Sequence, residues 1–62
     1  MNILTIDKAI AAIQKKFDGN ANILDLASDT ILDIICVDKR TQEYYEVYSN
    51  EDWTTLKIER VF

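Results

Sequence analysis

The chain has 62 residues, of which 48% are hydrophobic, with one glycine and no proline. This composition is unlike that of disordered chains, and the length allows one small domain, 1–62. Seven basic and eleven acidic residues give a net charge of −4. Phosphate contacts need clustered Lys and Arg, so direct nucleic-acid binding is not expected. With no histidine and a single cysteine, Cys36, the chain offers neither an internal disulfide nor a zinc ligand set.

Polar side chains interrupt the first part of the chain. Asp7, Lys8, Gln14, Lys15 and Lys16 stand among the apolar residues of 1–17. A signal peptide or membrane span needs a continuous apolar run, so neither is expected. The expectation is a soluble cytoplasmic protein with no membrane partner.

The apolar residues of this part have helical spacing. They fall at i, i+3, i+4, i+7 and i+11, which places them on one stripe: Ile6, Ala9, Ile10, Ile13 and Phe17. Thr5 can cap the start, and Gly19 can adopt the left-handed conformation that ends many helices. The pattern predicts a helix over 6–18.

After Gly19 the chain is enriched in β-branched and aromatic residues. Such runs predict strands, here at 23–27, 30–37, 43–48 and 54–62. Residues 30–37 are apolar on both alternating sets except at Asp33, which is typical of a central strand. The prediction is an α+β fold with one N-terminal helix packed on a three- to four-stranded antiparallel sheet. The expected core is Ile10, Ile13, Phe17, Leu32, Ile34, Val47, Leu56 and Ile58.

Residues 23–35 also fit a helical stripe. A helix there would stack Asp25, Asp29 and Asp33 at i, i+4 and i+8, and like charges at this spacing are unfavourable. Strands are therefore preferred, and a second helix in 21–35 stays open.

No set of residues predicts catalysis. Cys36 lies in an apolar strand, where a cysteine usually serves as a small core residue. Asp25, Asp29, Asp33 and Asp38 do not follow the order of a calcium loop, and a single glycine cannot form a phosphate loop. We expect no enzyme, no metal site and no cofactor.

The region after residue 20 is acidic and carries a tyrosine-rich strand. Alternation in 43–48 places Tyr44, Glu46 and Tyr48 on one face and Tyr45 and Val47 on the other. Tyr and Trp are enriched at interface hot spots. The candidate partner-binding residues are Asp33, Glu43, Tyr44, Glu46, Tyr48 and Trp53. The alternative is that these tyrosines pack against cross-strand neighbours on a face that is merely solvated.

One helix followed by three strands, with Ile6-Asp7-Lys8-Ala9-Ile10 at the start and Tyr45-Glu46-Val47-Tyr48 late in the chain, resembles a PepSY module. The resemblance covers about half of the chain. It implies a domain of a kind associated with peptidase inhibition and usually secreted or membrane-linked. The sequence departs from the family at Asn50-Glu51-Asp52-Trp53, where an Asp-x-x-Thr-Gly turn is normal.

In size and acidity the chain also resembles small phage-encoded inhibitors, including anti-CRISPR proteins and DNA-mimicking inhibitors of repair enzymes. Carboxylates on a rigid sheet can occupy a basic groove built for phosphates. The functional hypothesis is a non-catalytic inhibitor or adaptor that binds a protein, with a basic nucleic-acid-binding protein as one candidate partner. Two alternatives stay open. The chain could form a homodimer, or it could be a PepSY-like or otherwise structural domain whose acidic face is merely solvated.

Overall fold

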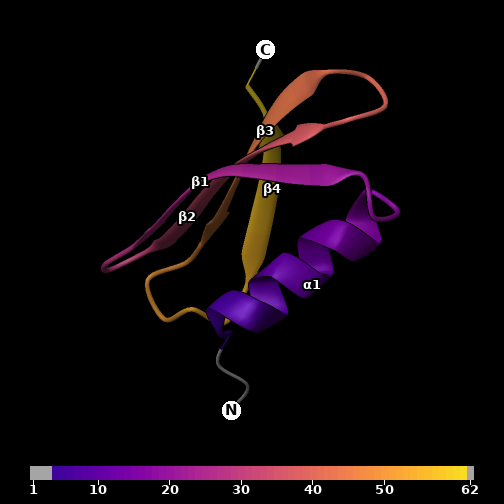
Figure 1. Cartoon of the computed structure of the whole chain (residues 1–62). Coiled ribbons are helices and arrows are strands. Elements are labelled where there is room, and N and C mark those ends of the chain that lie inside the picture. The colour runs from indigo at the N-terminus through magenta and orange to yellow at the C-terminus, as the bar shows by residue number, and fades with distance from the viewer. Residues whose placement is uncertain (1–3, 62) are drawn as a thin grey trace.

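The computed structural model describes residues 4–61 and contains one helix and one four-stranded sheet (Figure 1). The elements are α1 (Ile6–Lys16), β1 (Ala21–Ser28), β2 (Leu32–Asp38), β3 (Glu43–Ser49) and β4 (Leu56–Arg60). All three strand pairings are antiparallel and the order is β1-β2-β3-β4. The predicted α+β class with an N-terminal helix is confirmed.

Helix α1 has the expected cap and ends slightly earlier than predicted. The Thr5 hydroxyl accepts a hydrogen bond from the Lys8 amide at 3.2 Å, which satisfies one of the free N–H groups of the first turn. The helix ends at Lys16 because Asp18 and Gly19 both take left-handed conformations, with φ of 53° and 79°. No helix in residues 4–61 is long and apolar enough to cross a bilayer.

Residues 21–28 and 32–38 form two strands joined by a short turn, so a second helix in 21–35 is excluded. β1 carries a bulge between Ile23 and Asp25, which leaves Leu24 without a partner in the register. A bulge inserts one extra residue and shifts the alternation beyond it. Leu26 is consequently paired with Ile34, on the same side of the sheet as Ile23 and Cys36.

The core lies between α1 and one face of the sheet. Its buried members are Ala9, Ile13, Phe17, Ala21, Leu32, Ile34, Cys36 and Val47. The Phe17 and Tyr45 rings lie 4.9 Å apart between centroids and are tilted, a favourable aromatic arrangement.

Three members of the expected core are only half-buried: Ile10, Leu56 and Ile58. Leu56 and Ile58 lie on β4, an edge strand with a neighbour on one side only, and they pack against the margin of the core. Ile10 lies on the helix beside fully buried Ala9, so the stripe that faces the sheet is narrower than the sequence pattern suggests.

Candidate functional site

The sheet has a second face that points away from α1, here called the outer face. Strand alternation and the observed register assign to it Asn22, Asp25 and Ala27 of β1, Asp33, Ile35 and Val37 of β2, Tyr44, Glu46 and Tyr48 of β3, and Lys57 and Glu59 of β4. The helix lies on the opposite side, and no other element of residues 4–61 covers the outer face (Figure 1).

On the outer face Glu46 lies between two other carboxyl groups, those of Asp33 and Glu59. Glu46 is paired directly with Glu59 of β4, while Asp33 lies on the other neighbouring strand, opposite Tyr48. The charge of Asp33 raises the pKa of Glu46, and the hydrogen bond that a protonated Glu46 makes to Asp33, desolvation and the charge of Glu59 add to the effect. Like charges this close favour the protonated form of one of them.

Asp33 also lacks a donor when both carboxyl groups are ionised. Its Oδ1 atom is buried, and no donor in the described chain bonds to it. A proton on Glu46 would supply the missing hydrogen bond, which agrees with the raised pKa of that group. The Asp33–Glu46 pair is therefore a place where an added cation or donor would be stabilising.

The tyrosines border these acids. The Tyr48 hydroxyl donates to Glu59 Oε1 at 2.7 Å, which orients the phenol ring, and this bond is the main reason that the pKa of Tyr48 is raised. Tyr44 lies opposite Val37, with 38% of its surface exposed. An aromatic and acidic surface is thus present on the outer face.

Beside the acids the surface is hollowed. The hollow has a volume of about 400 Å³. Ala27, Asp29, Thr30 and Ile31 line it from the end of the β1–β2 hairpin, and Asp33, Glu46, Tyr48 and Glu59 line it from the strands. A volume of this size is within the usual range for small-ligand pockets.

The structure brings together Asp33, Tyr44, Glu46 and Tyr48 of the six candidate residues and separates the other two. Glu43 lies on the same side of β3 as Tyr45 and Val47. Its Oε2 atom is 2.7 Å from the guanidinium of Arg60. Trp53 packs against the core and donates from Nε1 to the Thr30 carbonyl at 3.1 Å. Strand parity and packing therefore place Glu43 and Trp53 off the outer face, and the binding role of the six residues stays a prediction.

Sequence reasoning missed Glu59, which faces Glu46 across the β3–β4 pairing. The signal was present, since Leu56 and Ile58 alternate with Lys57 and Glu59. The pairing of β4 with β3 could not be read from the sequence because it depends on the length and course of the loop after Ser49.

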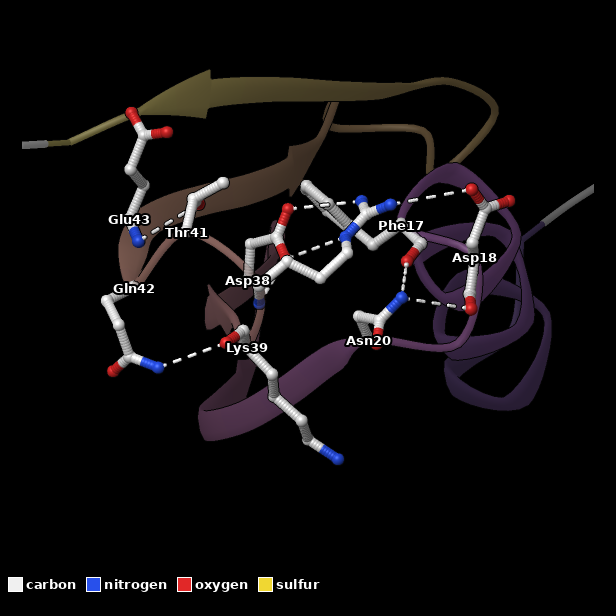
Figure 2. Close-up of polar contacts among 9 residues, drawn as sticks. Phe17, Asp18, Asn20, Asp38, Lys39, Thr41, Gln42 and Glu43 are labelled. Carbon is white, nitrogen blue, oxygen red and sulfur yellow. Dashed lines mark hydrogen bonds and ion pairs between the residues drawn. The ribbon is translucent and has the colours of Figure 1, made fainter.

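At one end of the sheet, charges are neutralised instead of crowded (Figure 2). Asp38 Oδ1 accepts from the Arg40 amide at 2.9 Å, and Oδ2 accepts from the guanidinium at 3.2 Å. The same guanidinium lies 3.5 Å from Asp18 Oδ2. Hydrogen bonds from the Arg40 side chain and backbone lower the pKa of Asp38. This network joins the α1–β1 and β2–β3 connections and is structural.

Groups that could do chemistry are sparse in residues 4–61. Cys36 is fully buried, and its pKa is raised by desolvation and by the charge of Asp38, so little of the thiol is present as reactive thiolate. Within this part of the chain, no three acidic or cysteine side chains are arranged to hold a metal ion.

Comparison of the chain with protein-family models, curated proteins and solved structures finds no match.

Proposed function

We propose that this chain is a non-catalytic protein-binding module whose outer face engages a basic surface on a protein partner. One observation carries the proposal: Asp33, Glu46 and Glu59 lie together on an uncovered sheet face. The ion pairs found among residues 4–61 do not include any of the three. Folding alone gives no reason to gather like charges in this way, since crowded carboxylates are destabilising.

The two tyrosines complement the acids. Carboxylates steer a basic partner towards the face and raise the association rate, while Tyr44 and Tyr48 supply contact area that slows dissociation. In the concrete version of the proposal, the module is a phage or mobile-element inhibitor that occupies the phosphate-binding groove of a nucleic-acid-binding protein. The unpaired thiol of Cys36 suits a reducing compartment, so the cytoplasm is the proposed location.

A pull-down from lysate of the native host tests the proposal when three forms of the protein are compared. They are the wild type, Glu46→Lys on the outer face, and Glu51→Lys, which makes the same charge change at an exposed position in the β3–β4 loop. Circular dichroism first establishes that each variant is folded.

The proposal predicts a partner that the wild type and Glu51→Lys retain and Glu46→Lys loses. A partner retained equally by all three forms would place binding elsewhere, with the helix surface around Lys8, Lys15 and Lys16 as the next candidate. If both variants lose the partner equally, the change in net charge alone explains the loss, and the position of Glu46 does not matter.

A further inference from the structure

The hollow on the outer face is lined by carboxyl groups together with some apolar surface. Asp33, Glu46 and Glu59 supply carboxyl groups, Ala27 and Ile31 supply apolar surface, and Asp29 and Thr30 add polar groups beside these two. A long side chain with a cationic tip combines a charge of the opposite sign with apolar surface.

Among residues 4–61, no ion pair joins a Lys or Arg side chain to Asp33, Glu46 or Glu59. Arg40 bonds Asp38 and Asp18, and Arg60 bonds Glu43. Lys57 is on the outer face, opposite Tyr48, but no ion pair within residues 4–61 joins it to the acids. Meanwhile Asp33 Oδ1 is buried without a donor. The carboxyl groups that line the hollow are thus complementary in charge to a cationic group.

We infer that the hollow receives one arginine side chain of the protein partner, with its guanidinium among Asp33, Glu46 and Glu59 and its aliphatic stem against Ala27 and Ile31. This inference rests on the proposed function and names the chemistry of the partner at that same face.

Arginine fits the site better than lysine for two reasons. Its planar group carries five N–H donors and can bond two carboxylates at once, whereas an ammonium acts as a point charge. Arginine also stacks on aromatic rings, and the Tyr48 ring that lines the hollow is already oriented by its bond to Glu59.

A titration followed by ¹⁵N–¹H correlation spectra tests the inference without knowledge of the partner. The probes are the peptide acetyl-Ser-Gly-Arg-Gly-Ser-amide and its lysine counterpart. We expect saturable shifts centred on the amides of Asp33, Glu46, Tyr48 and Glu59. Binding of the arginine peptide should be about tenfold tighter than that of the lysine peptide.

Two conservative variants and one control locate the effect. Glu46→Gln and Asp33→Asn should each weaken the binding of the arginine peptide about five- to tenfold, because each removes one charged acceptor. Glu51→Gln makes the same change in net charge outside the hollow, and its affinity for the arginine peptide should stay within about twofold of the wild-type value. The spectra themselves show whether each variant is folded.

The possible outcomes separate the two proposals. Arginine selectivity that depends on Glu46 and Asp33 supports the inference. Equal binding of both peptides at the outer face overturns the arginine site but leaves the acidic docking face standing. Shifts centred on α1, or no saturable shifts at the outer face, overturn the inference and remove the support that peptide binding gives to the proposed function.

Discussion

At the scale of single residues, two carboxyl groups have opposite environments. Asp38 accepts hydrogen bonds from the amide and guanidinium of Arg40, which stabilise its charged form and lower its pKa. Glu46 faces Asp33 and Glu59, which destabilise its charged form and raise its pKa. The first arrangement is what folding favours, and the second is one that binding can relieve.

Glu46→Gln should therefore increase stability at neutral pH. A group whose pKa is raised on folding contributes stability that is complete below the ordinary value of 4.5 and is lost as the pH rises through the folded-state pKa. Urea melts of the wild type should show this decline, and those of Glu46→Gln should show a weaker one. Glu51→Gln is the matched control, and its stability should change with pH as steeply as that of the wild type. Identical pH dependence in all three proteins would refute the repulsion between Asp33 and Glu46.

Cys36 should react slowly with thiol reagents in the folded protein. Its side chain is fully buried, and burial raises its pKa, so both access and thiolate content are low. Labelling by a chromogenic disulfide should be far slower under native conditions than in denaturant. A native rate close to the denatured one would show that this position of β2 does not face the core.

At the scale of elements, α1 depends on its contact with the sheet, since an isolated helix of this length is marginal in water. Ile13 is fully buried at the centre of that contact, whereas Ile10 is half-buried at its margin. The same substitution at the two positions therefore separates packing from helix propensity.

Ile13→Ala should lower the free energy of unfolding by about 2–5 kcal/mol through lost burial and a residual cavity, a large share of the stability of so small a domain. Ile10→Ala should lower the free energy of unfolding clearly less than Ile13→Ala does. Denaturant melts of both variants measure the difference, and equal losses, or a change at Ile13 below about 0.5 kcal/mol, would contradict the packing of α1.

Some elements could be predicted well because their signals are local. The stripe of Ile6, Ala9, Ile13 and Phe17 and the cap at Thr5 determine α1, and alternation alone separates Tyr44, Glu46 and Tyr48 from Tyr45 and Val47. The bulge in β1, the partner of Glu43 and the packing of Trp53 depend on contacts between distant segments. No local pattern in the sequence encodes them.

At the scale of the whole molecule, every strand pairs with its neighbours in the chain, and one helix covers one face. After the helix, the chain runs from each strand directly to the next, so no element of residues 4–61 covers the other face of the sheet (Figure 1). The shape of the fold and the position of the acids therefore point to the same surface, which is where we place binding.

We expect this open acidic face to bind a basic partner, and the dependence of the association rate on salt concentration is a direct test of this claim. For a partner captured by the wild type, raising salt from about 50 to 500 mM should slow association strongly, because screening weakens steering. Glu46→Lys should slow association at low salt and flatten the salt dependence, while Glu51→Lys should do so less. Association that is insensitive to salt and unchanged in Glu46→Lys would contradict the claim.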